Sequence, residues 1–392
     1  MPTSAKPLRI GIIGCGVIST IYFKNTALFK GVIITACADV RADAAEKQAK
    51  AFGVKAMSVA ALLADPDIDA IINLTVPNAH FAVSKAALEA GKHVFSEKPI
   101  TVTAAEAKDL CDIADAKKRA LAVAPDTFLG PGHQLARKLI DDGKIGRIVA
   151  GSATFMSRGM EHWHPDPTFF FKPGGGPVLD MGPYYITALI NLIGPIRRVV
   201  AMTGAGLPER TVSAAGPMQG KTIKVETPTT ALGILQFEQG ALVTLSMSWD
   251  VYKHSAKPIE LHGTDGSMRV PDPNFFGGIV EVAEGRGDWV AHDTQAMPLG
   301  RYNHQQGGIG PFVAANYRML GVTEMAASIA DKRVPRTCGR IAQHALDVME
   351  AVLHSGQSGH TVEVTGGRRP AALGVDETKA LLVNPAAVAG TT

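Results

Sequence analysis

The chain has 392 residues, of which 46% are hydrophobic and 19% charged, and its formal net charge is +3 at neutral pH. This length favours two domains over a single core, and the composition is typical of a globular protein. The small charge, with no basic stripe, argues against a nucleic-acid or membrane-surface partner.

The compartment is expected to be a reducing cytoplasm. The first six residues are too polar for a secretory signal, and no apolar run of about 18 residues follows. Four cysteines are scattered along the chain, and their spacing fits neither a zinc site nor a disulfide framework. They are Cys15, Cys37, Cys111 and Cys338.

Strand-like and helix-like segments alternate along the first third of the chain. This alternation predicts an α/β fold with a parallel sheet covered on both faces. The expected strands are Leu8–Ile13, Val32–Ala38, Ala70–Thr75, His93–Ser96 and Ala120–Ala124. The expected helices lie around Ile18–Phe29, Asp43–Phe52, Val59–Leu63, His80–Ala90 and Ala104–Lys117.

A glycine motif sits between the first expected strand and helix. Gly14 suits the tight turn out of the strand, Gly16 lets a pyrophosphate approach the backbone, and the small Ser19 preserves close helix packing. The helix start offers N–H groups to that pyrophosphate. Asp39, 20 positions after Ser19, ends the second strand at the offset expected of a ribose-binding carboxylate. The unit therefore predicts a dinucleotide-binding Rossmann domain.

The texture changes after Ala124, so we place a domain boundary there and expect domains at 1–124 and 125–392. The second domain is expected to hold the substrate and the oligomer contacts. A helix at Gln134–Asp141 and a strand at Ile148–Phe155 precede a loop rich in His, Pro and Phe. Alternating residues over 197–282 then predict an open, mostly antiparallel sheet. Helical patterns return at 323–331 and 340–354, and the tail from Asn384 is expected to fray.

Three motifs at this spacing resemble the Gfo/Idh/MocA oxidoreductases, the glucose–fructose oxidoreductase and inositol dehydrogenase superfamily. They are the glycine motif, Glu97-Lys98-Pro99 at a strand end, and the segment from Gly174 to Gly182 that contains Asp180. The resemblance covers roughly residues 7–365. It implies a Rossmann domain, a second α/β domain, a nicotinamide cofactor and a sugar, polyol or glycoside substrate.

Lys98 is the first catalytic candidate. It follows a parallel strand at its carboxyl end, where open α/β sheets bind ligands. The resemblance implies that this lysine contacts substrate near the nicotinamide ribose. Glu97 could pair with Lys98 or touch the ribose, and a plain surface carboxylate is the other interpretation.

Asp180 and Tyr184 are the next candidates, and both are expected on a helix that opens at Asp180 and runs to Ile193. Asp180 could bind substrate hydroxyls, as the resemblance implies, or cap the helix. The family pattern has His four positions after this aspartate, whereas this chain has Tyr184 after Pro183. We expect Tyr184, assisted by Lys98, to take the proton of the alcohol, because a cation lowers a phenol's pKa. The alternatives are Lys98 itself or a loop histidine.

The loop candidates are His162, Trp163 and His164, whose aromatic and hydrogen-bonding groups suit a carbohydrate. The other interpretation is that Trp163 plugs a domain interface. No carboxylate or cysteine set accompanies the two histidines, so no metal site is expected. Asp126 and Phe128, after the last Rossmann strand, are further substrate candidates. Residues of lower specificity are His133, Asn303, His304, Tyr317 and Arg318.

The cofactor is expected to be NAD, since the Asp39 carboxylate accepts from both ribose hydroxyls and repels a 2′-phosphate. Arg41 leaves NADP open, because its guanidinium could meet that phosphate. The resemblance also implies cofactor contacts from the segment after the third strand. The full predicted cofactor set is Gly14, Gly16, Val17, Ile18, Asp39, Arg41, Thr75, Pro77, Asn78, His80, Glu97 and Lys98.

Three functions compete on these residues. The first is an NAD(P)-dependent dehydrogenase acting on a secondary alcohol of a sugar, cyclic polyol or glycoside. The second is an NAD-retaining lyase or glycoside-cleaving enzyme that oxidises its substrate transiently. The third is a non-catalytic sugar sensor, against which Lys98 and Asp180 argue. The resemblance further implies a homodimer or homotetramer that covers the open face of the antiparallel sheet.

Overall fold

A computed structural model describes residues 6–305 and 313–390 of the chain. These residues form two compact units that interleave along the sequence. Of the described residues, the first unit comprises 6–129, 317–343 and 373–387, and the second comprises 130–305, 313–316, 344–372 and 388–390. Residues 317–343 and 373–387 thus belong with the amino-terminal third. The division into functional domains at 1–124 and 125–392 stays a prediction.

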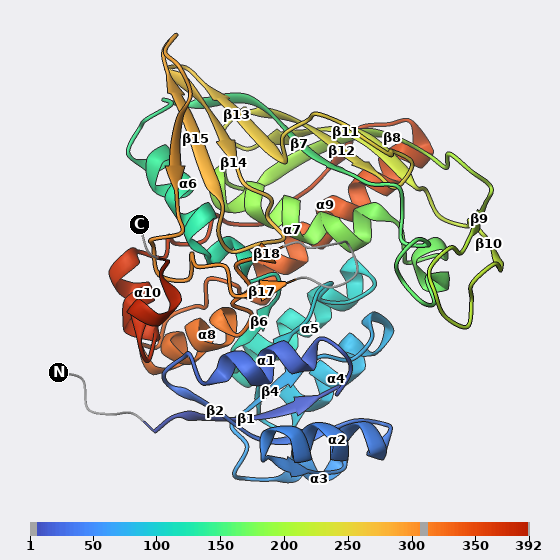
Figure 1. Ribbon diagram of the computed structural model, residues 1–392, viewed down its shortest axis with the longest axis vertical. Helices are drawn as coiled ribbons and strands as arrows, with labels where there is room; N and C mark the ends of the chain where they lie inside the picture. Colours follow the sequence, from blue (N-terminus) through green and yellow to red (C-terminus); the bar gives the residue numbers. More distant parts are fainter. Residues whose placement is uncertain (1–5, 306–312, 391–392) are drawn as a thin grey trace. The chain divides into compact units, whose positions relative to one another are not determined.

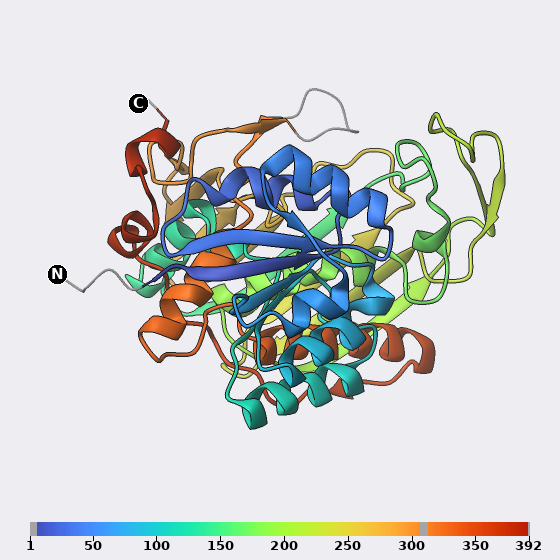
Figure 2. The same ribbon diagram turned by 90° about the horizontal axis from the view of Figure 1, so that it is seen from below.

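The first unit is built on six parallel strands in the order β3-β2-β1-β4-β5-β6. The strands are β1 Leu8–Ile13, β2 Val32–Ala38, β3 Lys55–Ala56, β4 Ala70–Asn73, β5 His93–Ser96 and β6 Leu121–Val123. Their near-continuous apolar sequence reflects burial on both faces. Helices lie on either side of the dark-blue strands in Figure 2, so the predicted doubly covered parallel sheet is confirmed.

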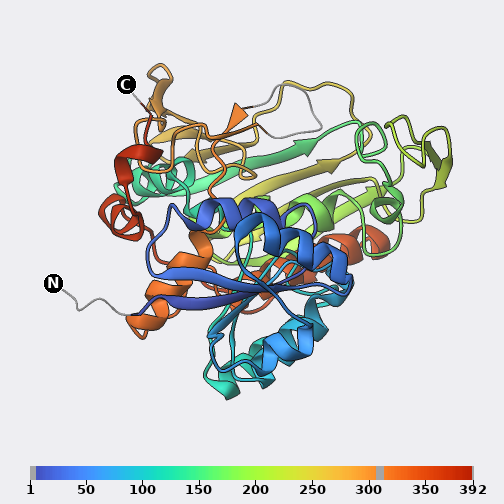
Figure 3. The same ribbon diagram turned by 60° about the horizontal axis from the view of Figure 1, so that its bottom comes forward.

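The helices of the first unit come from both ends of the chain. They are α1 Ser19–Thr26, α2 Ala42–Phe52, α3 Val59–Ala64, α4 Pro77–Glu89, α5 Ala104–Lys117, α8 Leu320–Ala330 and α10 Val375–Leu381. Two 3-10 turns follow β6 and α10 in the chain, η1 Thr127–Leu129 and η3 Pro385–Val388 respectively. Helix α8 contacts β2, β5 and β6, which explains why a stretch near residue 320 belongs to this unit (Figure 3).

The second unit contains a nine-stranded sheet in the order β16-β15-β14-β13-β7-β12-β11-β8-β19. Its strands are β7 Ile148–Met156, β8 Ile196–Gly204, β11 Thr230–Phe237, β12 Leu242–Ser248, β13 Ile259–Gly263, β14 Gly266–Val270, β15 Ile279–Glu284, β16 Val290–Asp293 and β19 Val362–Glu363. Only β7 and β12 pair in parallel among them, so the predicted mostly antiparallel sheet is confirmed.

Helices cover one face of this sheet, and no helix of the described residues covers the other face. Helix α7 Pro177–Leu192 contacts β11 and β12, and α6 Pro131–Asp141 contacts β14 and β15 (Figure 1). The last helix, α9 Gly339–Ser358, begins in the first unit and continues in the second. Two small hairpins complete the unit, β9 Glu209–Thr211 with β10 Thr222–Lys224, and β17 His304–Gln305 with β18 Val313–Ala314.

Several expected boundaries are wrong, and the start of helix α7 is one of them. Helix α7 begins at Pro177, behind the N-cap Gly176, and not at Asp180. Asp180 therefore lies in the first helical turn, with its own N–H donating to the Gly176 carbonyl over 3.1 Å, and it is not the cap residue. The tail is also less frayed than expected, because the carbonyl of Val388 accepts from Arg301 and the N–H of Gly390 donates to Gln295.

Candidate active site

The predicted phosphate turn has the local geometry that a pyrophosphate needs. Gly14 has φ +102°, and a Cβ there would lie 2.5 Å from the Leu74 carbonyl, so only glycine fits. A Cβ on Gly16 would meet no atom within 4 Å. The first glycine is thus fixed by the neighbouring strand, while the second leaves open space in front of the start of α1. These residues fit a dinucleotide.

Asp39 is held at the end of β2 by two backbone donors. Its Oδ2 accepts from the N–H of Cys15 over 2.7 Å, and its Oδ1 accepts from the N–H of Arg41 over 2.9 Å. The carboxylate is half-buried, so its remaining lone pairs can accept hydrogen bonds from a ligand. Arg41 is exposed and precedes α2, where its guanidinium is not among the groups that fix Asp39.

Apolar side chains are exposed at the same carboxyl edge of the parallel sheet. Val17 is 97% exposed, Val40 is 96% exposed and Val76 is 68% exposed, and they follow β1, β2 and β4 respectively. Ile18, the remaining predicted residue of the glycine turn, is half-buried. Valines left in water on three adjacent loops suit the apolar faces of a bound nucleotide.

The loop after β4 is organised by Asn73, which is buried. Its Oδ1 accepts from the N–H and hydroxyl of Thr75, and its Nδ2 donates to the His80 carbonyl and the Ser84 hydroxyl. Pro77 and Asn78 are exposed in the first turn of α4. The predicted cofactor residues Thr75, Pro77 and Asn78 are therefore brought to the carboxyl edge of the sheet, and their contact with cofactor stays a prediction.

His80 supports this loop from below. Its ring is 1% exposed, with Nδ1 2.6 Å from the Pro99 carbonyl and Nε2 3.0 Å from the Thr75 carbonyl. A neutral imidazole can donate to one of these carbonyls, and an imidazolium to both. The geometry thus ties the loop after β4 to the turn that carries Lys98.

Glu97 and Lys98 follow β5 and are both half-buried. Glu97 accepts from the phenol of Tyr22 over 2.8 Å and from the N–H of Lys98 over 3.1 Å. Burial beside this carboxylate raises the pKa of Tyr22 well above its usual value. Glu97 is therefore tied to α1, and the structure places Lys98 at the same sheet edge as the glycine turn.

Asp126 and Phe128 are each 1% exposed. The Oδ2 of Asp126 accepts from the N–H of Gly321 over 2.8 Å, at the first turn of α8. Burial raises the pKa of Asp126 to about 6. Tyr317 and Arg318 are buried in the same unit. The predicted substrate roles of Asp126 and Phe128 stay predictions, but the carboxylate of Asp126 has a structural partner that sequence reasoning missed.

In the second unit, Asp180 and Tyr184 lie one turn apart on α7. Asp180 is half-buried and Tyr184 is 7% exposed, and the helix continues through Pro183. One of the glycines before the helix has a packing role: a Cβ on Gly175 would lie 2.4 Å from the Phe170 carbonyl. A Cβ on Gly174 would meet no atom within 4 Å, so the run is tight at Gly175 and open at Gly174.

The neighbouring Tyr185 and Asp272 were missed by sequence reasoning. Tyr185 is 1% exposed, and its hydroxyl donates to Oδ1 of Asp272 over 3.5 Å. Burial raises the pKa of both groups, while Asp272 also accepts from the N–H of Asn274. His133 is fully buried, and burial lowers its pKa to about 4. No sequence motif predicts the pair of Tyr185 and Asp272, because the two residues are distant in sequence.

The predicted carbohydrate loop is partly occupied by its own aromatic packing. The ring of His164 meets Trp163 and Phe170 edge-on, each at 5.3 Å between centroids. Trp163 packs on a buried cluster of Met160, Phe170, Phe171, Val212, Ala214, Ile223 and Trp249. His162 is half-buried, and burial together with Arg158 lowers its pKa.

Two lower-specificity candidates lie elsewhere in this unit. Asn303 is paired with the backbone of Asn316 over 2.8 and 3.0 Å. The side chain of His304 lies outside the described residues. Within residues 6–305 and 313–390, no three His, Cys, Asp or Glu side chains gather as a metal site would require. Over the same residues, no helix has the length and apolar character to cross a membrane.

Two family models match the chain over most of this architecture. The model described as oxidoreductase family, NAD-binding Rossmann fold, matches residues 8–125, and the model described as Gfo/Idh/MocA C-terminal domain matches residues 133–269. The chain belongs to the Gfo/Idh/MocA oxidoreductases. This confirms the family resemblance carried by the three motifs. The first of the two domains is an NAD-binding domain, which confirms the predicted cofactor class.

Curated relatives agree with this membership. An uncharacterised oxidoreductase of Schizosaccharomyces pombe is 30% identical over 204 residues, which span 50% of this chain and 54% of the relative. Levoglucosan dehydrogenase of Pseudarthrobacter phenanthrenivorans is 28% identical, over 53% and 56% of the two chains. Inositol 2-dehydrogenase of Rhizobium meliloti is 27% identical, over 71% and 80%. The chain thus spans about half the length of the first two relatives.

Solved structures show the same fold. An NAD-binding oxidoreductase from Klebsiella pneumoniae has a TM-score of 0.77 at 22% identity, covering 92% of this chain and 100% of that one. Levoglucosan dehydrogenase in complex with NADH has the same TM-score, identity and coverage. At 22% identity, this likeness shows the fold of the chain and says nothing about its substrate.

Proposed function

We propose that this protein is an NAD-dependent dehydrogenase that oxidises a secondary alcohol of a sugar, cyclic polyol or glycoside. The observation that carries the proposal is the bond between the N–H of Cys15 and the carboxylate of Asp39, the predicted ribose acceptor, next to a glycine, Gly16, where a Cβ would meet no atom within 4 Å. Curated relatives named as levoglucosan, inositol and D-xylose dehydrogenases support the carbohydrate class of substrate.

The preference for NAD over NADP rests on charge. Asp39 is fixed by two backbone N–H groups, so it stays at the end of β2 and repels a 2′-phosphate. Arg41 is exposed two residues later and offers the opposing interaction. The two backbone hydrogen bonds favour NAD over NADP, because they hold the Asp39 carboxylate in place before a cofactor binds.

The nicotinamide ring, when bound, supplies the hydride acceptor. The protein's task is to hold the alcohol and to take its proton. We assign proton removal to Tyr184, with Lys98 as the cation that assists it, and hydroxyl binding to Asp180. The alternatives are Lys98 as the base itself, or His162 or His164. The ring of His164 packs against three aromatic rings, so His162 is the better candidate of the two loop histidines.

The decisive experiment is a panel of monosaccharides, inositols and glycosides with the purified full chain and NAD. A rise in reduced-nicotinamide absorbance is the expected result. Product formed without net NADH would instead indicate the NAD-retaining lyase, and NADH binding without turnover of any sugar would indicate the sensor. NADP in place of NAD tests the cofactor preference on the same substrates.

We also propose that the protein forms a homodimer or homotetramer through the open face of its nine-stranded sheet. Exposed apolar residues form two cross-strand rows there: Met202 opposite Leu232, and Val200 opposite Ile234. They line a hollow of about 380 Å³. A large exposed apolar patch is typical of a protein interface. A cytoplasmic location is proposed with it, supported by four buried cysteines that form no disulfide.

A further inference from the structure

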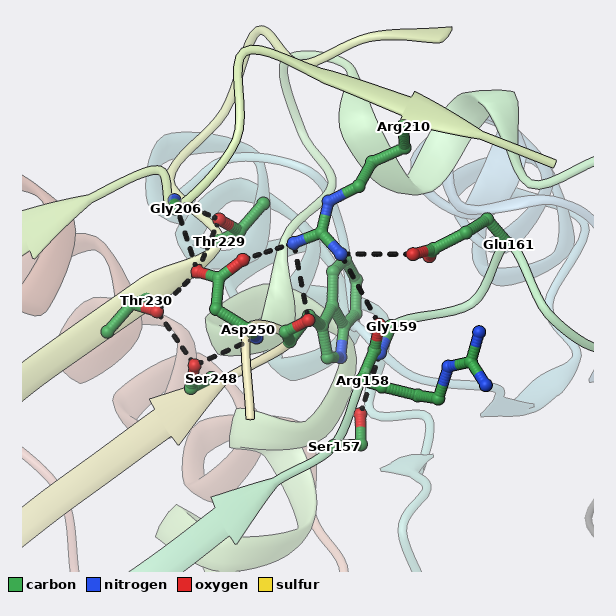
Figure 4. Close-up of polar contacts among 11 residues, drawn as sticks. Ser157, Arg158, Gly159, Glu161, Gly206, Arg210, Thr229, Thr230, Ser248 and Asp250 are labelled. Atoms are coloured by element: carbon green, nitrogen blue, oxygen red, sulfur yellow. Dashed lines mark hydrogen bonds and ion pairs between the residues drawn. The ribbon is translucent and has the colours of Figure 1, made fainter. Parts of the chain in front are cut away.

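Arg210 is a buried cation that links two other segments of the second unit, residues 158–161 and 249–250. Its side chain is 6% exposed, and its guanidinium donates to Oε1 of Glu161 over 3.0 Å and to Oδ1 of Asp250 (Figure 4). It also donates to the carbonyls of Arg158 and Trp249, each over 3.3 Å. One guanidinium therefore holds two carboxylates and two carbonyls that are 39 to 52 positions away in the sequence.

On one side of this cluster, Asp250 is held by several hydrogen bonds besides the one from Arg210. Oδ2 of Asp250 accepts from the hydroxyls of Thr229 over 2.7 Å and Thr230 over 2.6 Å, and from the N–H of Gly206 over 3.3 Å. Its own N–H donates to Ser248 (Figure 4). Residues at the ends of β11 and β12 thus fix Asp250, and Asp250 in turn holds Arg210 independently of the contacts that Arg210 makes with the loop.

The opposite side of the cluster grips the predicted substrate loop. Glu161 immediately precedes His162, Trp163 and His164, and its backbone carbonyl accepts from Ser213 and Ala214 over 2.9 Å each. Its Oε2 is buried and has no hydrogen-bond partner among the described residues. Arg210 therefore carries the charge compensation of this carboxylate, and removing a guanidinium from such a pair leaves a costly buried charge.

The guanidinium also bears on the aromatic cluster behind the loop. It lies 5.7 Å from the ring centroid of Phe171, which meets Trp249 at 5.8 Å. Trp163 packs against this same cluster. Arg210 thus contacts both the loop, through Arg158 and Glu161, and the aromatic cluster on which Trp163 packs.

We propose that Arg210 is a positioning residue that fixes the segment Glu161–His164 for recognition of the carbohydrate substrate. This inference rests on the proposed function, since it takes His162 and Trp163 as substrate contacts. We assign Arg210 no contact of its own with substrate or cofactor. Its fork of donors matches two carboxylates and two carbonyls, which a lysine ammonium cannot reproduce.

The test compares Arg210→Lys with Arg137→Lys. Arg137 is a matched control because its buried guanidinium also holds an aspartate, Asp141, and two carbonyls, those of Asn191 and Pro370, far from the loop in sequence. For Arg210→Lys we expect KM for the best sugar to rise about tenfold, as for a lost charge-assisted contact, with kcat within about threefold. Arg137→Lys should lower the melting temperature and leave KM unchanged.

A second measurement follows the loop directly. Hydrogen–deuterium exchange over residues 157–164 should increase in Arg210→Lys and in Glu161→Gln, but not in Arg137→Lys. Exchange in that segment equal to the control, or an unchanged KM with a lowered melting temperature, would show that Arg210 is merely structural and would overturn the inference. A wild-type protein that turns over no sugar would defeat the proposed function instead, and the exchange experiment would still decide on the positioning of the loop.

Discussion

The N–H of Cys15 donates to Oδ2 of Asp39 over 2.7 Å, so the glycine turn after β1 and the carboxylate after β2 are one structural unit. Through this bond, the residue between the two glycines orients the carboxylate that we propose accepts hydrogen bonds from the ribose. Asp39 accepts from two backbone N–H groups, and its remaining lone pairs are the ones that we propose accept from the ligand.

Replacing Asp39 by alanine should weaken NAD binding by about 10- to 100-fold, because hydrogen bonds to a charged group contribute roughly 1.5–3 kcal/mol. The same change should narrow the gap between NAD and NADP, since the repulsive charge is lost and Arg41 remains. Titration calorimetry with both cofactors measures the two affinities. An NAD affinity equal to that of the wild type would remove Asp39 from the cofactor site.

Gly14→Ala and Gly16→Ala should separate folding from binding. The first substitution places a Cβ 2.5 Å from the Leu74 carbonyl at φ +102°, so we expect a loss of stability of at least about 1–3 kcal/mol. The second places a Cβ in open space, so its melting temperature should stay near the wild-type value while NAD affinity falls. Thermal unfolding and NADH titration give both readouts. Equal melting temperatures for the two variants would contradict the assignment.

Tyr184→Phe should lower kcat by about 100-fold or more, as expected on removing a general base. NADH affinity should not change, because the hydroxyl is assigned to the alcohol and not to the cofactor. Tyr185→Phe is the matched control: it removes a buried hydroxyl, bonded to Asp272, from the same helix. Full turnover by Tyr184→Phe would show that Tyr184 is not the base and would favour Lys98 or His162 in that role.

The buried carboxyl of Asp126 should make stability depend on pH. Its pKa rises from 3.8 to about 6 in the folded protein. Between these values the folded state binds more protons than the unfolded state, so the free energy of unfolding falls as pH rises from about 4 to about 6. Two pKa units correspond to roughly 3 kcal/mol.

The variant Asp126→Asn removes this titration. It should therefore be more stable relative to the wild type at pH 7 than at pH 4, as measured by urea unfolding at both values. Its side-chain oxygen can still accept from Gly321, which separates the charge from the hydrogen bond. A stability difference that does not vary with pH would show that Asp126 titrates normally.

Met202→Asp with Leu232→Asp should dissociate the proposed oligomer, because each places a charge in the exposed rows of the open sheet. Light scattering after size-exclusion chromatography measures the mass. Val383→Asp, at a residue that is 57% exposed in the other unit, is the control and should leave the mass unchanged. A wild-type protein that elutes as a monomer would refute the interface.

Local boundaries were predictable where a strong local signal marks them. Strands β1, β2 and β5 and helix α5 run between the predicted residues, because apolar runs and flanking turns define their ends. Strand β4 ends at Asn73, two residues early, since the Asn73 side chain starts the turn by accepting from Thr75. Helix α4 begins at Pro77 rather than His80, as proline favours the first helical turn.

The candidate site divides in the same way. Glycine spacing, Asp39 and the Glu97-Lys98-Pro99 motif predict where the cofactor binds, because their chemistry is local to one strand end each. The burial of His80, the partner of Asp126 and the pair of Tyr185 with Asp272 were not predictable. Each depends on a group that only the folded chain brings near.

The sequence by itself determined the dinucleotide fold, the nature of the second sheet and the family, since these follow from periodicity and short motifs. The tertiary structure decided which residues support the loops: Arg210 reaches Glu161 across 49 positions, and α8 returns to the first sheet from near residue 320. The physical reason is that hydrogen bonds and packing depend on distance in space, which periodicity along the chain does not encode.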